Sequence, residues 1–312
     1  MTFQNAFSIT MLQLRFRNIV FFDFMDAVVW PKRFEIGYIA PIFNSFFYQN
    51  NIGDFDNMAL SANLRVQLPG LGNIWASLFV DEMSIQRDMW NFDRTMIAYQ
   101  LGINVPLPFL AFSSLRFSYT KINPYTFTHN RNFNPWYSGF DRDGNRLVME
   151  TAWVNNGASL GHYLPPNSDE FLLQFRTMPT RNLSTIFQYQ MIRRGATWGS
   201  SAVDGSHLLS ELDPDRGPQN HATWRFFLRD GAYQWKHIVR ASANWRLPNL
   251  PVSLFGEAGV IFSYFTNIDA PANNAGLEPG ERPRPHPFRI INTPEYPMST
   301  SFIVRMGFSV FR

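Results

Sequence analysis

The chain of 312 residues contains no cysteine and few charged residues. The absence of cysteine excludes disulfide frameworks, thiolate metal sites and thiol catalysis. Charged residues make up 16% of the chain, well below the roughly 25% of a typical soluble domain. The net charge is only +3, which is too small and too dispersed for a nucleic-acid-binding surface. We therefore expect neither thiol chemistry nor a nucleic-acid partner.

Aromatic residues are as abundant as charged ones, at 16%, and include 31 Phe, 11 Tyr and 9 Trp. This replacement of charge by aromatic surface indicates contact with lipid. Long apolar runs are nevertheless absent. The uncharged stretch 95–115 has roughly the 20 residues of a membrane-spanning helix. Because Pro106 and Pro108 interrupt it, it is better explained as two strands and a turn.

An alternation of apolar and polar residues recurs along the whole chain. From Ile97 to Val105, for example, every second residue is apolar, whereas a helical face requires spacings of three and four. We expect about twelve strands of about nine to twelve residues, the length that crosses an outer membrane. The segments with this pattern are 7–16, 18–28, 60–68, 74–82, 97–105, 115–120, 171–176, 183–191, 239–247, 252–264 and 302–310.

The connections between these segments alternate between short and long. The short ones are rich in turn-forming residues and occur at 17–18, 68–73, 105–108, 178–182 and 247–251. The long ones occupy about 41–57, 83–94, 122–168, 195–221 and 266–298. Such an alternation is typical of outer-membrane barrels, which have short periplasmic turns and long extracellular loops.

These patterns predict an all-β fold: a single antiparallel transmembrane β-barrel over residues 1–312, integral to the outer membrane and monomeric. A soluble β-sandwich also alternates, but its strands are usually nearer five or six residues. No export signal precedes the first strand, and Asp23 and Asp26 break the only candidate apolar run. We expect that the signal peptide and some N-terminal strands are missing from this sequence.

Several blocks of sequence resemble the capsule assembly Wzi-like family of outer-membrane β-barrels. They are residues 24–30, 38–43, 53–60, 119–129, 157–162 and 166–170, within the region of about 20–195. The resemblance implies a barrel that binds or anchors capsular polysaccharide or exopolysaccharide at the cell surface, acting as a lectin and not as an enzyme. The chain departs from the family in two ways. The family's N-terminal portion is missing, and the chain ends on Arg312 after Phe311 instead of on an aromatic residue.

Arginines dominate the charged positions on the polar sides of the strands. If these sides face the barrel lumen, few acidic residues oppose them, chiefly Asp81 and Glu257. Because guanidinium groups match carboxylates and phosphates in a bidentate manner, we predict a lumenal ligand site for acidic polysaccharide. In the alternative, the arginines pair with acidic residues of plugging loops and only fill the barrel. The residues of this candidate site are Arg65, Arg116, Arg176, Arg240, Arg246 and Glu257, with Arg305 on the same pattern.

Aromatic residues in the long connections are candidates for stacking on sugar rings. An aromatic ring offers a flat apolar surface with a polar edge. The alternative is that these residues belong to an interfacial girdle or pack within the loops. The candidates are Tyr125, Trp136, Tyr137, Trp153 and Tyr163.

No catalytic or metal-binding motif is recognisable. The six His residues lack the zincin spacing, and neither a nucleophile elbow nor a phosphate-binding Gly-rich loop is present. Asp169 and Glu170 are adjacent, so in a strand they point to opposite faces and do not act as a pair. His129 and His162 are better explained as hydrogen-bonded loop residues than as groups of a membrane hydrolase.

The sequence therefore predicts a non-catalytic protein whose partners are outer-membrane lipid, acidic polysaccharide and the outer-membrane assembly machinery, with no cofactor and no metal. The alternative function is a channel or transporter for anionic or hydrophobic small solutes. A third hypothesis, a soluble β-rich protein, predicts that the chain stays in the aqueous fraction without detergent.

Overall fold

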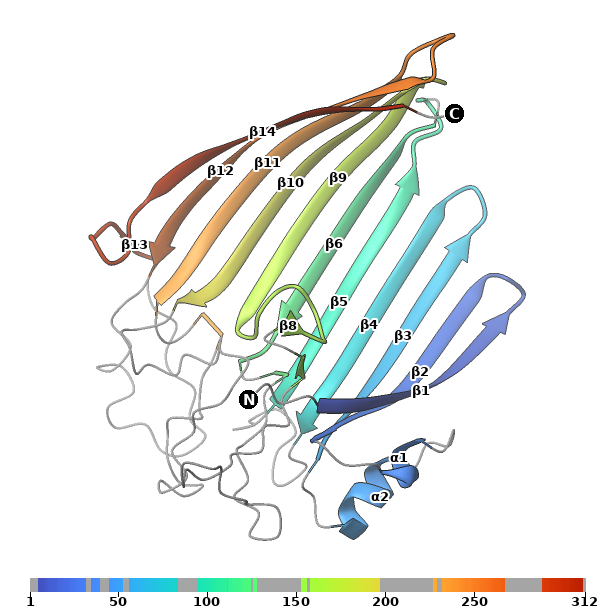
Figure 1. Cartoon of the computed structure of the whole chain (residues 1–312), viewed down its shortest axis with the longest axis vertical. Helices are drawn as coiled ribbons and strands as arrows, with labels where there is room; N and C mark the ends of the chain where they lie inside the picture. Colours follow the sequence, from blue (N-terminus) through green and yellow to red (C-terminus); the bar gives the residue numbers. More distant parts are fainter. Residues whose placement is uncertain are drawn as a thin grey trace.

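Long antiparallel strands make up most of the computed structural model (Figure 1). The structure describes residues 5–31, 35–39, 45–52, 56–83, 95–110, 112–124, 126–127, 153–155, 158–196, 227–228, 232–266 and 288–310. The strands are β1 (Asn5–Phe16), β2 (Val20–Pro31), β3 (Asn57–Leu68), β4 (Gly72–Met83), β5 (Thr95–Pro106), β6 (Ser114–Ile122), β7 (Val154–Asn155), β8 (Ala158–Ser159), β9 (Ser168–Thr180), β10 (Leu183–Ala196), β11 (Ala232–Arg246), β12 (Val252–Thr266), β13 (Ile290–Ile291) and β14 (Ser299–Val310).

Two short helices, α1 (Ile36–Ile39) and α2 (Ser45–Ile52), lie between β2 and β3. α2 falls within the long connection predicted at 41–57, and α1 lies just before it. Tyr38 fixes them to the sheet: its ring packs on Trp30, and its hydroxyl donates to Asp56 Oδ2 at 2.7 Å. Among the described residues, no helix has the length and apolar character needed to cross a membrane.

Twelve of these strands form one antiparallel sheet, in the order β1-β2-β3-β4-β5-β6-β9-β10-β11-β12-β13, with β14 also paired to β12. The predicted all-β antiparallel fold is confirmed, and each predicted segment overlaps one long strand. Within the described part of the chain, no backbone pairing joins β1 to β14, so both are edge strands of the sheet.

The two ends of the sheet differ. At one end the chain turns tightly, as at Arg17 and Asn18. Their φ angles of 48° and 54° fit a type I′ turn, whose twist matches that of the two strands it connects. The helices α1 and α2 and the start of β1 lie at the opposite end, while the end of β14 lies beside the tight turns (Figure 1). We call these the tight-turn end and the loop end.

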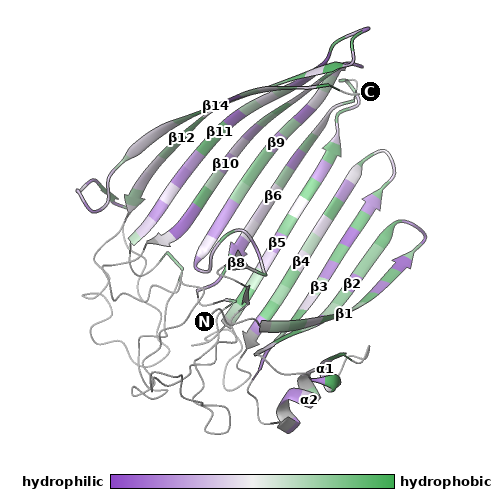
Figure 2. Ribbon diagram, viewed as in Figure 1, coloured by the Kyte–Doolittle hydropathy of each residue, from purple (hydrophilic) through white to green (hydrophobic). Residues whose placement is uncertain are grey.

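The two faces of the sheet also differ, as the alternating colours along each strand in Figure 2 show. One cross-strand row of the apolar face consists of Ile103, Phe117, Leu173, Tyr189, Val239, Val260 and Phe302. One row of the polar face consists of Asn63, Ser77, Gln100, Thr120 and Glu170. A period of two therefore separates the faces, as the sequence predicts.

A segment from the long connection between β6 and β9 folds back over the polar face. We call residues 153–155 and 158–167 the strap; its strands β7 and β8 form a separate two-stranded ribbon. Trp153 and Leu164 of the strap are buried in one cluster with Ala27 of β2 and Ile122 of β6, and Ile192 of β10 packs against it. Because one short segment reaches strands so far apart in the sheet, the polar face is the concave one.

Candidate binding face and capped cavity

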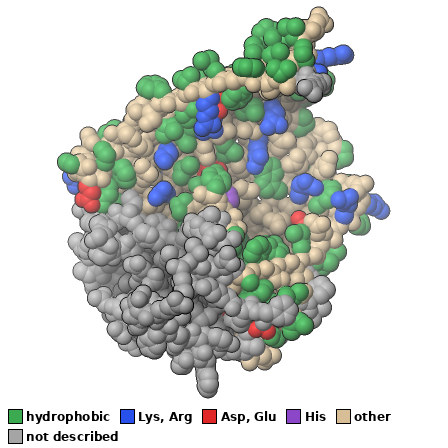
Figure 3. All heavy atoms as spheres, in the orientation of Figure 1, with side chains coloured by type: hydrophobic (Ala, Val, Ile, Leu, Met, Phe, Trp, Pro, Cys, Tyr) green, Lys and Arg blue, Asp and Glu red, His purple; other side chains and the backbone are tan. Residues whose placement is uncertain are grey.

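The candidate arginines and Glu257 all lie on the polar face. Arg116 is in line with Arg240 across β6, β9, β10 and β11. Arg176 is in line with Glu257 and Arg305 across β9 to β14. Figure 3 shows Lys and Arg side chains spread over this side of the sheet, with few acidic groups among them. The predicted gathering of these residues on one face is therefore present.

Two of the arginines are partly neutralised. Glu257 lies with its Oε1 3.2 Å from Arg240 Nε and its Oε2 3.6 Å from Arg305 Nη1, and its side chain is largely buried. The acidic partner comes from the neighbouring strand and not from a loop. Arg240 and Arg305 are consequently weaker candidates for an external anion than the remaining arginines of this face.

The other guanidinium groups lie over rings or face solvent. Arg65 stacks over Phe21, with 4.4 Å from its Cζ to the ring centroid, and Arg116 stacks over Trp75 at 5.0 Å. Arg176 is exposed and lies diagonally across from Arg116, a separation of roughly 7–8 Å between Cα atoms in antiparallel pairs. Within the described residues these three arginines form no ion pair, so an anion can approach them.

The predicted sugar-stacking residues fall into three groups. Tyr125, Trp136 and Tyr137 lie outside the described residues. Trp153 is only 4% exposed, so its ring is not available on the outer surface. Tyr163 is 67% exposed, and its hydroxyl donates to Glu170 of the sheet, which fixes the ring in place. Tyr163 alone among the described candidates has the exposure that stacking requires.

Asp81 fixes the strap to the sheet. Its Oδ1 accepts a hydrogen bond of 3.0 Å from Trp153 Nε1, and its Oδ2 accepts one of 2.6 Å from the backbone N–H of Phe127. Both rings then pack on Phe79, at centroid distances of 5.1 Å for Phe127 and 5.9 Å for Trp153. The sequence places Asp81 among the lumenal acidic residues but gives no sign of this anchoring role.

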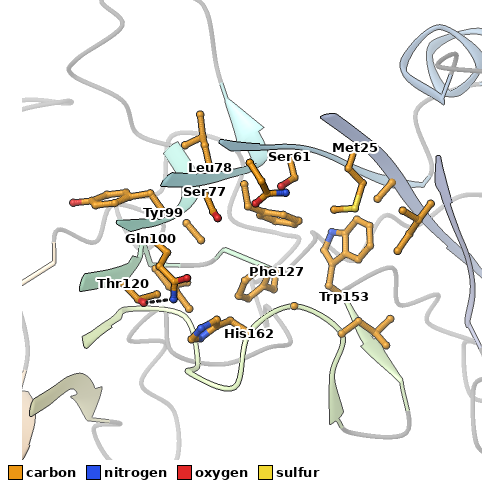
Figure 4. A pocket seen from close by; sticks show the side chains of 18 residues that line it. Met25, Ser61, Ser77, Leu78, Tyr99, Gln100, Thr120, Phe127, Trp153 and His162 are labelled. Carbon is orange, nitrogen blue, oxygen red and sulfur yellow. Dashed lines mark hydrogen bonds between the residues drawn. The ribbon is translucent and has the colours of Figure 1, made fainter. Parts of the chain in front are cut away.

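A cavity of about 340 Å³ lies between the strap and the polar face (Figure 4). The sheet provides its floor, including Ser61, Ser77, Gln100 and Thr120, while Leu78 and Tyr99 point away from it in Figure 4. The roof comes from Phe127 and from the strap residues Trp153, Leu160, Gly161 and His162. Sequence reasoning missed this site because its two sides are separated by a long connection.

His162 lies in the roof as a neutral imidazole. Its Nδ1 accepts a hydrogen bond of 3.2 Å from the backbone N–H of Leu164, so the proton of the neutral ring is on Nε2. The ring packs on Tyr163 at a centroid distance of 4.4 Å. Burial lowers the pKa of His162 below its ordinary value near 6.5, because the charged form is poorly solvated there.

Acidification is expected to loosen the strap through His162. The imidazole binds a proton more readily when the strap is open, so the stability of the closed strap falls as the pH drops below about 6.5. Because the intrinsic rate of amide exchange itself slows as the pH falls, the quantity to measure is the protection factor of the amides of residues 160–164, which should decrease between about pH 7.5 and about pH 5. In His162→Asn, whose amide oxygen can accept from Leu164 but does not titrate, this decrease should be absent. An equal decrease in both proteins would exclude His162 as its cause.

The apolar face carries an aromatic belt near the loop end. Tyr189 and His237 are joined by a hydrogen bond of 2.9 Å, and His237 and Tyr264 are 3.4 Å apart at Nε2 and the hydroxyl. Tyr119 donates to Asp169 Oδ2 at 2.9 Å. In each pair, the second residue lies one cross-strand row nearer the loop end than the first. The polar tips of the first residues therefore point toward the loop end, and their rings lie nearer the centre of the sheet.

Asp169 and Glu170 point to opposite faces, as the sequence predicts. Asp169, on the apolar face, accepts from Arg193 Nε at 2.8 Å, and Glu170, on the polar face, accepts from Tyr163 and Gln190. No group of three His, Asp or Glu side chains that could hold a metal ion occurs in the described part of the chain.

Comparison of the chain with protein-family models, with curated proteins and with solved structures found no match.

Proposed function

We propose that this chain forms the wall of an outer-membrane β-barrel and binds acidic polysaccharide at the cell surface without catalysis. The observation that carries the proposal is the contrast between the two faces. The apolar face exposes large side chains such as Leu101, Phe187 and Val239 along its centre, and the polar face presents Arg65, Arg116 and Arg176, which form no ion pair among the described residues. An apolar exterior with a polar interior is the arrangement that lipid requires of a spanning sheet.

The aromatic belt supports the membrane part of the proposal. Tyr and Trp rings with their polar tips directed outward are enriched where lipid meets water. The rings of Trp235 and Tyr264 stack at a centroid distance of 5.9 Å, and His237 stacks on Tyr264 at 5.6 Å. Such a belt at the loop end fits a boundary of the lipid bilayer at that level.

Arg116 and Arg176 support the ligand part of the proposal. Both lie on the concave face, they are diagonal neighbours, and their guanidinium groups suit the carboxylates of acidic sugars. The resemblance of the sequence to the Wzi-like capsule assembly family agrees with such a ligand. In this reading the chain retains polysaccharide and performs no reaction on it.

The double variant Arg116→Gln/Arg176→Gln is expected to release polysaccharide from cells. A hydrogen bond to a charged group contributes about 1.5–3 kcal/mol, so losing one such contact weakens binding about tenfold or more. The measurement compares cell-bound with released polysaccharide in strains that lack the gene or carry the wild type or a variant. Arg17→Gln/Arg181→Gln removes the same charge at two tight turns and serves as the matched control.

The outcome separates the two function hypotheses. Normal retention in the deletion strain, together with reduced uptake of small anionic or hydrophobic solutes, would replace polysaccharide binding by transport. Loss of retention in the deletion strain with full rescue by Arg116→Gln/Arg176→Gln would remove these arginines from the binding site.

A further inference from the structure

The cavity beneath the strap differs chemically from the arginine-bearing part of the same face. None of the described residues that line it is Lys, Arg, Asp or Glu. Asp81, which lies next to it, is occupied by the N–H groups of Trp153 and Phe127. Because an isolated charge is costly to bury without a partner, this cavity selects against a charged ligand group.

The floor of the cavity offers hydrogen bonds in a fixed arrangement. Gln100 Oε1 accepts from Trp75 Nε1 at 3.2 Å, and Gln100 Nε2 donates to Thr120 Oγ1 at 2.9 Å. These contacts orient the Gln100 amide and leave its second N–H and the Thr120 hydroxyl proton to donate elsewhere. Ser77 lies next to Gln100 in the same row, and Asn63 follows it.

The position of Trp75 depends on a glycine. The indole lies so close over Gly102 that a Cβ at this residue would meet Trp75 Cζ2 at 2.1 Å. This close approach lets the indole N–H reach Gln100 on the strand of Gly102 itself. The orientation of Gln100 is therefore built into the sheet and does not depend on the strap.

The roof of the cavity offers mainly the flat surfaces of rings. Phe127 and Trp153 face the floor from the opposite side, with the imidazole of His162 beside them (Figure 4). Aromatic rings provide flat surfaces for the C–H groups of a ligand. A ligand that fits both sides carries hydroxyl groups on one side and C–H groups on the other.

We propose that this cavity binds one uncharged sugar ring. A pyranose has hydroxyl groups for Gln100, Thr120 and Ser77 and a C–H face for the rings of the roof. An apolar solute would leave the amide and hydroxyl groups of the floor unpaired, which costs about 1–3 kcal/mol for each buried group. The biological setting rests on the proposed function: the arginines bind acidic groups of the polysaccharide, and the cavity binds a neutral unit of it.

The test uses the purified full chain in detergent and a panel of methyl pyranosides of glucose, galactose, mannose and N-acetylglucosamine. Binding is followed by saturation-transfer NMR, with methyl glucuronoside as the charged probe and toluene as the apolar probe. We expect at least one uncharged pyranoside to bind in preference to both. Thr120→Val, which keeps the shape but removes the hydroxyl, should weaken it about tenfold, the equivalent of one lost hydrogen bond.

Two controls locate the effect. Thr185→Val makes the same change outside the cavity, and Arg17→Gln/Arg181→Gln removes two positive charges at the tight turns; both should leave pyranoside binding unchanged. The proposal is overturned if no pyranoside of the panel binds, if glucuronoside or toluene binds more tightly, or if Thr120→Val and Thr185→Val behave alike. Because the assay needs no polysaccharide and no cells, failure here and failure of polysaccharide retention are separate results.

Discussion

Arginine in place of Val239 is expected to reduce sharply the amount of folded protein in the membrane. Val239 is the central residue of β11, lies on the apolar face and is 52% exposed. If this face contacts lipid, a charge there lies near the middle of the bilayer and costs about 2–4 kcal/mol. The measurements are the fraction of protein recovered in the outer membrane and the free energy of unfolding in lipid vesicles.

Ser242→Arg is the matched control for this prediction. Ser242 lies on the same strand but on the polar face, directly opposite Glu257, which provides a nearby negative charge. We expect Ser242→Arg to fold and insert nearly as well as the wild type. Equal losses for the two variants would contradict contact of the apolar face with lipid, and recovery of the wild type in the aqueous fraction without detergent would contradict it independently.

Removal of the Asp81 carboxylate is expected to free the strap from the sheet. In Asp81→Ala, the indole N–H of Trp153 and the backbone N–H of Phe127 lose a charged acceptor while they remain buried. Each hydrogen bond to a charged group contributes about 1.5–3 kcal/mol, so we expect the free energy of strap opening to fall by about 3 kcal/mol or more. Hydrogen exchange of residues 158–167 should then accelerate by about two orders of magnitude.

Asp23→Ala provides the comparison for the strap. Asp23 is a second carboxylate of the polar face, on β2 between Gln13 and Asn63. Its removal changes the charge of the face by the same amount, and we expect strap exchange to stay near the wild-type rate. If Asp23→Ala and Asp81→Ala accelerate exchange equally, the effect is one of general electrostatics and the anchoring role of Asp81 is wrong.

The long strands are predictable from sequence because their signal is local. Two faces in different surroundings impose a period of two on each strand, and segments such as 97–105 display it without any tertiary knowledge. The ends of the strands are less predictable. β11 begins at Ala232, well before the segment 239–247, because His237 is a polar residue on the apolar face and Ile238 an apolar residue on the polar face, and together they interrupt the alternation.

The helices α1 and α2 are not predictable in the same way. Ile36, Ile39 and Phe47 are exposed, so no apolar stripe of helical period marks them. Their position depends on contacts that are distant in sequence. The Tyr38 hydroxyl reaches Asp56, and the backbone N–H of Ser45 donates to Asp26 Oδ2 at 3.2 Å.

The candidate site also has a part that is predictable from sequence and a part that is not. The shared face of the arginines follows from strand parity alone, so the sequence predicts it. The cavity requires Trp153 to meet Asp81, which lies 72 residues earlier in the chain. A tryptophan in a long polar connection gives no indication of such a partner. Trp153 therefore suggests a sugar-stacking surface from sequence and is a buried anchor in the structure.

The order of the strands limits how the sheet can close. Ten successive antiparallel pairings lead from β1 to β14, so these two edge strands run in the same direction. A direct seam between them would be parallel, whereas bacterial outer-membrane barrels have antiparallel strands in even number. A connection that leaves and re-enters the sheet at the same end can only add an even number of strands. With such an addition, β1 and β14 would still run in the same direction. An entirely antiparallel closed wall therefore needs an odd number of further strands between β1 and β14, and two copies joined edge to edge in the same orientation would still meet in parallel.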